Sequence, residues 1–477
     1  MAGPRAKRIN ILLRRVARLC AVMLFALLAN ATYLQGFKAP SLNADPRNQR
    51  TLIGRFDHPR GDILTYDGTT IARSLRTSGP YPYVRTYLGG EMYAPVTGYD
   101  SLYRTTGVEQ AQDAALLGDD PRVRVRSMVT DGTVRGADVM LTISDRVQWA
   151  AYQGLQASGR SGAAVAVNPA TGAILAMASY PSYDPNAFTT FDPKALAQAD
   201  ARLSGDPSRP LVNRAIDQTY PPGAAFEIVT AAAALTSGEY APTTRLDAPA
   251  ALPLPGTDER LWSPDGRPCG SGRPSLAAAF RLSCDTAFAS VGLQLGQDTI
   301  REQAEAFAFN DDLRIPLEVA PSTYPANSLD RPQTAMSAIG RHDDSVTPLM
   351  AAMMSAAVAN DGVLMRPYLV EEVRLADGSI INRADPAPYR TVLQPDQAGK
   401  LAAMMSAGAG PAWAGASAAV PDVAVAARAA TTEGGHTLVT AFAPAGAPQV
   451  AVAVVLEDGG STSAELLVRG ILEAALA

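Results

Sequence analysis

Residues 220–230 read Tyr-Pro-Pro-Gly-Ala-Ala-Phe-Glu-Ile-Val-Thr, and this stretch says more about the fold than any other. The alanine-rich segment that continues to Thr236 has the composition of a buried helix. Ala224 and Glu227 are three residues apart, so a helix that begins here presents both on one face. The stretch therefore predicts a buried helix whose first turn carries a methyl group and a carboxyl group side by side.

Outward from this stretch, residues 163–179 read as a β-hairpin. Two apolar runs flank a turn that contains Asn168, Pro169 and Gly172. Further periodic segments alternate between the two types, which predicts a mixed α and β domain. The expected strands are 139–144 and 449–456, and the expected helices are 145–158, 276–295, 334–339, 347–358 and 465–477.

These segments resemble the transpeptidase domain of class B penicillin-binding proteins, most closely the actinobacterial, penicillin-binding protein A-like type with a short pedestal. That family reads approximately Tyr-Pro-Pro-Gly-Ser-Thr-Phe-Lys-Ile-Val where this chain has residues 220–229. The hairpin 163–179 is a further likeness, and residues 60–72 are similar to the signature that opens the family's pedestal. The resemblance covers residues 59–477. It implies an α/β (α+β) fold with a β-lactamase/transpeptidase-like five-stranded antiparallel sheet flanked by helices, plus a small N-terminal pedestal domain.

The resemblance also implies three motifs around one cleft, and all three are degenerate here. The family's Ser-x-x-Lys, Ser-x-Asn and Lys-Thr-Gly motifs supply the nucleophile, its base and the carboxylate-binding groups. The matching positions in this chain are Ala224, Glu227, Ser283, Asp285, Arg428, Ala429 and Ala430. Only the serine of the second motif survives, and a methyl group at position 224 cannot form an acyl ester.

Lysine usage supports this interpretation. None of the four lysines lies in a motif, and arginine cannot accept a proton in place of lysine because its pKa is too high. Counting Glu227, Asp285 and Arg428, the cleft changes from a formal charge of +2 in the family to −1. Glu227 and Arg428 are expected to pair. The alternative is that Glu227 points to water and Arg428 packs along its strand.

Two other hydroxyl groups could act as nucleophiles. Thr230 lies one helical turn after Glu227, and Ser283 remains at the expected cleft, but a hydroxyl needs an adjacent base of suitable pKa. The histidines His58, His342 and His436 are dispersed, with no metal-ligand or triad spacing. We expect no metal and no cofactor.

The N-terminal segment predicts a membrane anchor. Residues 1–38 carry seven Lys or Arg and no acid, and residues 19–37 are without charge, close to the length that spans a bilayer. The positive-inside rule places the N-terminus in the cytosol and the rest outside, as a single-pass protein of the cell membrane. The alternative is a cleaved signal peptide with its cleavage site at Ala29-Asn30-Ala31.

The expected domains follow from these segments. They are a basic cytosolic tail (1–18), a transmembrane anchor (19–38), a linker with a dimerisation-type pedestal (39–137) and a transpeptidase-like penicillin-binding domain (138–477). An extracytoplasmic compartment is oxidising, so Cys269 and Cys284 are expected to form a disulfide. Two separate buried thiols are the alternative.

The function expected from these features is a catalytically inactive, penicillin-binding-protein-like membrane protein of peptidoglycan assembly that acts by binding or scaffolding. Its expected partners are the membrane and, through the resemblance, peptidoglycan stem peptides, a glycan-polymerising membrane protein or an active paralogue. After residue 38 the chain has 34 basic and 46 acidic residues, which argues against a nucleic-acid surface. Two alternatives stay open: an active D,D-transpeptidase with an unrecognised nucleophile, and a non-covalent sensor of stem peptides or β-lactams.

Overall fold

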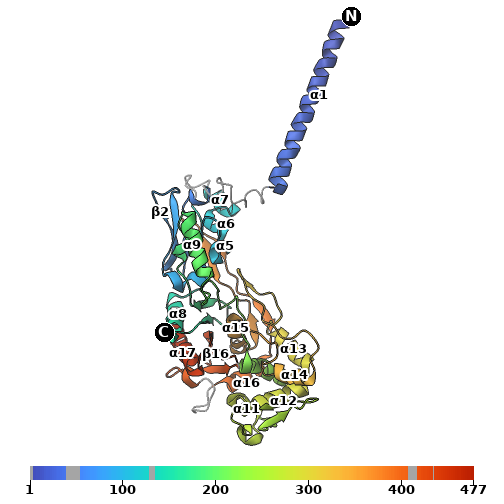
Figure 1. Cartoon of the computed structure of the whole chain (residues 1–477), viewed down its shortest axis with the longest axis vertical. Helices are drawn as coiled ribbons and strands as arrows, with labels where there is room; N and C mark the ends of the chain where they lie inside the picture. The colour runs from blue at the N-terminus through green and yellow to red at the C-terminus, as the bar shows by residue number, and fades with distance from the viewer. Residues whose placement is uncertain (1–3, 39–53, 128–134, 407–415, 433) are drawn as a thin grey trace. The chain divides into compact units, whose positions relative to one another are not determined.

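The structure is a computed structural model that describes residues 4–38, 54–127, 135–406, 416–432 and 434–477. The chain divides into two units, Met1–His58 and Pro59–Ala477. The first unit contains helix α1 (Pro4–Tyr33) and a π-helical turn η1 (Leu34–Lys38), drawn in blue in Figure 1. The helical segment of residues 14–38 is long and apolar enough to cross a membrane, and its side chains are exposed.

The second unit contains the predicted five-stranded antiparallel sheet. Its strand order is β15-β16-β17-β5-β6, and nearly every residue of the sheet is buried. The hairpin predicted over 163–179 is the pair β5 and β6, in which Val165 lies opposite Met177. The strands are β5 (Gly162–Val167), β6 (Ile174–Tyr180), β15 (Ala426–Thr431), β16 (Thr437–Ala443) and β17 (Val450–Leu456).

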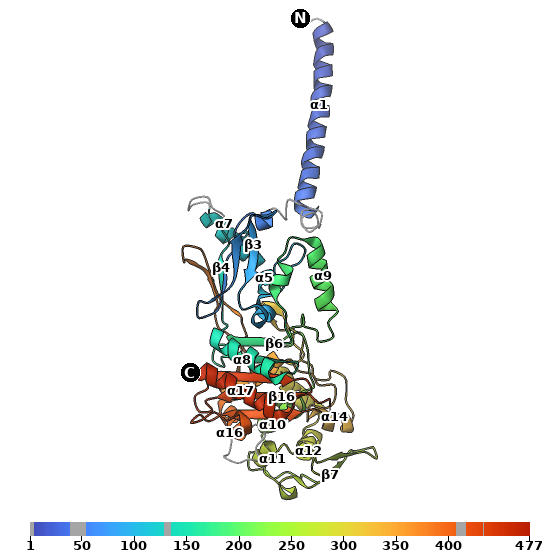
Figure 2. The same cartoon turned by 60° about the vertical axis from the view of Figure 1, so that its left-hand side comes forward.

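Helices cover both faces of this sheet. Helices α8 (Asp145–Ser158) and α17 (Ser461–Leu476) pack on one face, as Figure 2 shows. Helix α15 (Pro348–Ala359) packs against the opposite face. Alanine and valine side chains of the sheet form a core with α8 and α17. On α15, Ser355 is hydrogen-bonded to Thr440 at 2.6 Å. Every residue of α15 from Pro348 to Val358 is buried, and this burial on all sides matches the apolar composition of the helix.

A helical region adjoins the edge strand β15. The single helix expected over 276–295 is wrong, because Ser283 adopts a left-handed φ of 53° and the chain breaks there into two helices. The elements of this region are η4 (Gly223–Phe226), α10 (Glu227–Thr236), β7 (Ala251–Pro253), β8 (Arg260–Trp262), η5 (Cys269–Gly272), α11 (Leu276–Leu282), α12 (Asp285–Leu295), α13 (Gln297–Ala306), α14 (Arg331–Ser337) and α16 (Pro395–Met405).

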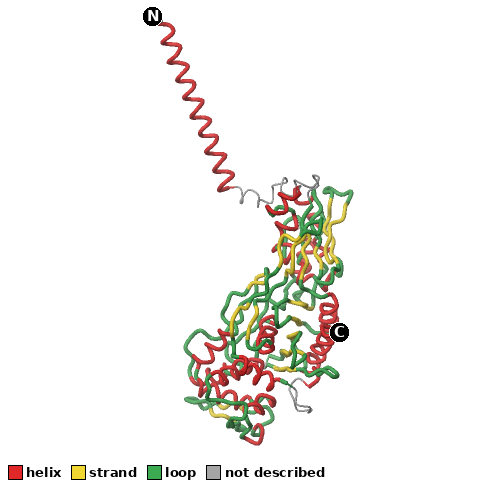
Figure 3. Tube along the Cα trace, turned by 180° about the vertical axis from the view of Figure 1, so that it is seen from behind, coloured by secondary structure: helices red, strands yellow, loops and turns green. Residues whose placement is uncertain are grey.

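The pedestal contains a second sheet of six strands, and Figure 3 shows the strands of both sheets in yellow. The order is β13-β12-β4-β1-β2-β3, so the sheet takes strands from both sides of residue 137. The dipeptide Asp67-Gly68, which is a hairpin-turn signal in the sequence, joins β1 to β2, with Gly68 at φ 83°. The strands are β1 (Ile63–Leu64), β2 (Thr70–Arg76), β3 (Tyr83–Tyr87), β4 (Asp138–Leu141), β12 (Val370–Arg374) and β13 (Ile380–Arg383).

Short elements complete the unit. Besides η2 (Gly90–Met92) and η3 (Pro185–Phe188), they are α4 (Ala94–Thr97), α5 (Gly107–Ala111), α6 (Asp113–Leu117), α7 (Pro121–Ser127), α9 (Pro193–Ser204), β9 (Arg314–Ile315), β10 (Leu317–Glu318), β11 (Val363–Met365), β14 (Pro388–Thr391) and η6 (Ala416–Ala418). The sequence also predicts a loop or flexible insertion over residues 407–420, which are rich in Ala, Gly and Pro, and most of these residues lie outside the described ones.

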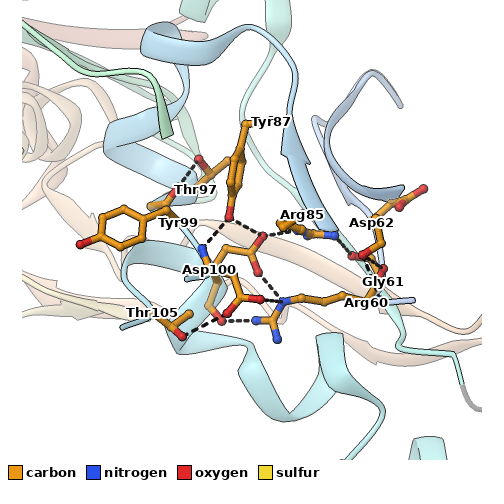
Figure 4. A network of polar contacts seen from close by, with 12 residues as sticks. Arg60, Gly61, Asp62, Arg85, Tyr87, Thr97, Tyr99, Asp100 and Thr105 are labelled. Carbon is orange, nitrogen blue, oxygen red and sulfur yellow. Dashed lines mark hydrogen bonds and ion pairs between the residues drawn. The ribbon is translucent and has the colours of Figure 1, made fainter. Parts of the chain in front are cut away.

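A buried polar network holds the pedestal together (Figure 4). The carboxylate of Glu109 accepts from Nε of Arg60 and from Nε of Arg85, each at 2.5 Å, and from the Tyr87 hydroxyl at 3.2 Å. Burial raises the pKa of Glu109, but Arg85 and Arg60 together lower it further, so the net shift is downward. The network joins the start of the pedestal to β3 and α5.

Candidate functional site

The three segments that carry the predicted motif positions meet at Arg428. This residue lies on the edge strand β15, opposite Thr440 of β16. Its Nε donates to the carbonyl oxygen of Ala224 at 2.9 Å, in the turn before α10. One terminal nitrogen donates to the carbonyl of Phe280 in α11, just before the helix break at Ser283. The fold therefore brings together the positions that the sequence motifs predicted.

Arg428 is held on all sides by the protein. Its side chain is 1% exposed, and its second terminal nitrogen donates to Oε2 of Glu227. The guanidinium carbon lies 4.5 Å from the centre of the Phe280 ring, in cation–π geometry. Each nitrogen of the guanidinium thus has an acceptor within the chain, so the group is not presented to a substrate carboxylate.

Glu227 lies at the start of α10 and is fully buried. The pairing with Arg428 expected from the sequence is present, and the alternative in which Glu227 points to water is wrong. Burial raises the pKa of Glu227 to about 8, since the lowering by Arg428 is smaller and Asp285 raises the pKa further. The other oxygen, Oε1, has no hydrogen-bond partner among the described residues. The carboxyl group therefore changes charge near pH 8.

A second pair, which the motif comparison missed, lies beside the first. Asp285, at the start of α12, is 2.7 Å from a terminal nitrogen of Arg341. We call Glu227, Asp285, Arg341 and Arg428 the four-charge cluster. With Arg341 included, the formal charge of the cluster is zero, compared with −1 when only Glu227, Asp285 and Arg428 are counted. The sequence signal for this second pair is the position of Arg341 directly after Gly340. Gly340 lies so close to Gly223 that a Cβ atom added to it would be 2.4 Å from the Gly223 carbonyl oxygen.

The hydroxyl groups of Thr230 and Ser283, the two possible substitute nucleophiles, differ in their environments. Thr230 is fully buried, and its hydroxyl donates to the carbonyl of Ala338 at 2.6 Å. Ser283 is partly exposed and occupies the left-handed C-cap of α11. Ala429 and Ala430 contribute only buried methyl groups from β15. Among the seven motif positions, Ser283 alone carries a hydroxyl group.

Cys269 and Cys284 are joined by a disulfide, with their Cα atoms 5.7 Å apart. The bridge ties η5 to the residue that links Ser283 to Asp285, so it fixes the helix break from outside. It closes a loop with a sequence separation of 15 residues. A loop of that length is stabilised by roughly 3 kcal/mol in the chain-entropy model.

The histidines do not converge on a site. The ring of His436 packs edge-on against Tyr220 with centroids 5.7 Å apart, whereas His342 lies in the loop that follows Gly340. Within the part of the chain that the structure describes, no group of three or more His, Cys, Asp or Glu side chains could hold a metal ion.

A buried helix start, a helix break and an edge strand that meet beside a five-stranded antiparallel sheet define the penicillin-binding transpeptidase architecture. The chain belongs to the class B penicillin-binding protein family. The model of the penicillin-binding protein transpeptidase domain matches residues 162–474, and the model of the penicillin binding protein A dimerisation domain matches residues 60–139.

Relatives from mycobacteria share nearly the whole chain. The peptidoglycan D,D-transpeptidase PbpA of Mycolicibacterium smegmatis is 42% identical over 468 residues, which is 94% of both chains. The PbpA of Mycobacterium tuberculosis is 40% identical and covers 98% of this chain and 99% of its own. The imipenem acyl-enzyme complex of penicillin-binding protein A from M. tuberculosis superposes with a TM-score of 0.83 at 39% identity, covering 89% of this chain and all of that one.

Proposed function

We propose that this chain is a non-catalytic member of its family that acts in peptidoglycan assembly by binding rather than by acyl transfer. The observation that carries the proposal is the buried pair of Glu227 and Arg428 beside the methyl group of Ala224. An acyl-enzyme needs a nucleophile and a base at these places. Here the nucleophile position holds Ala224, and the base position holds an acid that is bound to an arginine.

The replacement of both expected lysines supports the same conclusion. An arginine keeps its proton at all physiological pH values, so Arg428 can act neither as a base nor as a proton shuttle. Its three nitrogens bind Glu227 and two main-chain carbonyls, and its side chain is only 1% exposed, so the guanidinium is not accessible to a substrate. Thr230 is already committed to the carbonyl of Ala338.

The proposed location is the outer face of the cell membrane. The apolar helix of residues 14–38 would anchor the chain, with its basic N-terminal residues in the cytosol. A protein held there without acyl-transfer chemistry can position other components. We infer that its partner is a glycan-polymerising membrane protein or an active member of the same family.

A second candidate function is D,D-transpeptidation, and the names of the relatives favour it. The mycobacterial relatives at 40–42% identity are named peptidoglycan D,D-transpeptidases, and solved structures of one such protein are acyl-enzyme complexes. In this chain the reaction would need an unrecognised nucleophile, for which Ser283 is the exposed hydroxyl among the motif positions. A third candidate, non-covalent sensing of stem peptides or β-lactams, shares the binding role but predicts saturable binding without a covalent adduct.

One experiment separates these candidates. The full-length chain in detergent is incubated with a fluorescent penicillin beside the M. smegmatis PbpA, and adducts are measured by gel fluorescence and intact mass. The proposal predicts no adduct on this chain while the relative is labelled, with circular dichroism showing that both proteins are folded. A stoichiometric adduct would overturn the proposal, and peptide mapping would then identify the nucleophile. If the anisotropy of the fluorescent penicillin shows saturable binding that is reversed by dilution, and no adduct forms, the result would support the non-covalent sensor function.

A further inference from the structure

A cavity of about 580 Å³ lies away from the four-charge cluster, between the pedestal and the transpeptidase domain. Its walls come from α4 and α5 of the pedestal, from the loop 210–217 and from the segment that enters β10. A volume of this size falls within the range of about 300–1,000 Å³ that small-molecule sites occupy. None of the seven motif positions lines this cavity.

The walls of the cavity are fixed to one another by hydrogen bonds. The side-chain amide of Asn213 is buried and donates to the carbonyl of Pro95 at 2.8 Å, which joins the loop 210–217 to α4. The main chain of Ala320 donates to the carbonyl of Ile216 at 2.8 Å, which joins the segment after β10 to the same loop. The cavity is therefore formed before any ligand arrives, which lowers the entropic cost of binding.

The lining of the cavity is mixed, and polar groups contribute at least as much of it as apolar groups. Tyr183 and Ile216 are buried, whereas Arg104, Asp217 and Glu318 are exposed at its rim. A ligand that fits such a lining is polar along its length and carries ionised groups.

The opposite charges on the rim do not neutralise one another. Burial raises the pKa of the Tyr99 and Tyr183 hydroxyl groups, and the charge of Arg104 lowers the pKa of both in part. Although Asp217 is exposed over part of its surface, desolvation of its carboxyl group raises its pKa, and the group that lowers it is the main-chain N–H of Asn213 rather than Arg104. Among the described residues, no ion pair joins Arg104 to Asp217. The rim thus offers a cation for a carboxylate and, separately, an acid for an ammonium group.

We propose that this cavity binds a short zwitterionic peptide, with the peptide's carboxylate at Arg104 and its ammonium group at Asp217. Peptidoglycan stem peptides and other short peptides with free ends share this chemistry. The site uses none of the residues of the four-charge cluster, so the proposal does not depend on whether that cluster is catalytic. It gives the chain a ligand site between its two domains.

The test uses the full-length chain in detergent and saturation-transfer NMR titrations. The probes are the stem tripeptide L-Ala-γ-D-Glu-L-Lys and L-Ala-L-Ala-L-Ala, each also in a blocked form in which every amino group is acetylated and every carboxylate is amidated. The variants are Asp217→Asn, which keeps an acceptor for Asn213, and Arg104→Gln. Matched controls are Asp258→Asn and Arg267→Gln, which remove exposed charges elsewhere in the domain. Thermal unfolding checks that each variant is folded.

The proposal expects saturable binding of at least one free-ended peptide. Each cavity variant and each blocked peptide should bind about tenfold more weakly, since a charged hydrogen bond is lost, and the control variants should match the wild type. Binding of the stem tripeptide alone identifies peptidoglycan as the source, whereas binding of both probes identifies free-ended peptides in general. Absence of saturable binding of either probe, or unchanged affinity in both cavity variants, overturns the proposal. Penicillin labelling is a separate measurement, so failure of one proposal does not imply failure of the other.

Discussion

Replacing Arg428 by methionine is the most direct test of how the four-charge cluster stabilises the fold. The substitution keeps a long side chain that can pack on Phe280 but removes every donor. Three buried acceptors then lose their partner: the carboxyl group of Glu227 and the carbonyl groups of Ala224 and Phe280. Because Arg428 is 1% exposed, water cannot replace these hydrogen bonds without opening the structure.

The size of the effect follows from these contacts. A buried acceptor left without a donor costs about 1–3 kcal/mol, and three acceptors lose their donor here. The carbonyl groups can relax a little and the methionine packs in place of the guanidinium, so the losses do not add in full. We expect Arg428→Met to lower the free energy of unfolding by about 3–5 kcal/mol.

The assay is urea unfolding of the full-length chain in detergent, followed by tryptophan fluorescence. The matched control is Arg469→Met, since Arg469 forms an exposed pair with Glu473 and should change the free energy of unfolding by less than about 1 kcal/mol. The double variant Glu227→Met with Arg428→Met should lose less than the sum of its single variants, because neither polar group is then left unpaired. If Arg428→Met is no more destabilising than Arg469→Met, the reasoning about the cluster is refuted.

Three further predictions concern single contacts, all measured by the same unfolding assay. The pKa of Glu227 is about 8 in the folded chain against 4.5 for the free side chain, so its stabilisation is complete below pH 4.5 and is lost as the pH rises through 8, by about 1.4 kcal/mol per pH unit. Glu227→Gln should remove this pH dependence of the free energy of unfolding between pH 5 and 8. If the wild type and the variant show the same pH dependence, the raised pKa of Glu227 is contradicted. Changing Cys269 and Cys284 to serine should cost about 3 kcal/mol, as should reduction of the wild type; no change in either would show that the bridge imposes little constraint. Glu109→Gln should cost about 3–5 kcal/mol because two buried arginines lose their carboxylate, and a loss below 1 kcal/mol would count against the network of Figure 4.

The parts of the fold that depend on local sequence were predictable. The hairpin β5–β6 was expected because two apolar runs flank a turn containing Asn168 and Gly172, and helix α8 begins at the predicted Asp145. Strand β17 was expected over 449–456 and occupies 450–456. In each case a periodic pattern and its end signals lie within about 20 residues, so no distant contact was needed to interpret them.

Features that depend on distant contacts were not predictable from the pattern. The break between α11 and α12 interrupts a continuous helical pattern, and its causes are the left-handed Ser283 and the bridge from Cys269 to the next residue. The pedestal sheet pairs Val139 with Val373, which are more than 200 residues apart. Arg341 was visible in the sequence, but its role as the partner of Asp285 depends on the loop that brings Gly340 against Gly223.

Under the proposed non-catalytic function, the four-charge cluster also predicts that acyl-transfer chemistry cannot be introduced one residue at a time. A lysine at position 227 would place an ammonium group beside the buried guanidinium of Arg428, and two like charges at a buried site repel strongly. A lysine at position 428 alone would keep a positive charge beside Glu227. It lacks the planar guanidinium, however, so it could not also donate to both carbonyl groups, of Ala224 and Phe280, that Arg428 binds. A serine at position 224 would still face an acid in place of a base. The charges at 227 and 428 are therefore stable only as a pair, and a functional nucleophile requires both to change together with residue 224.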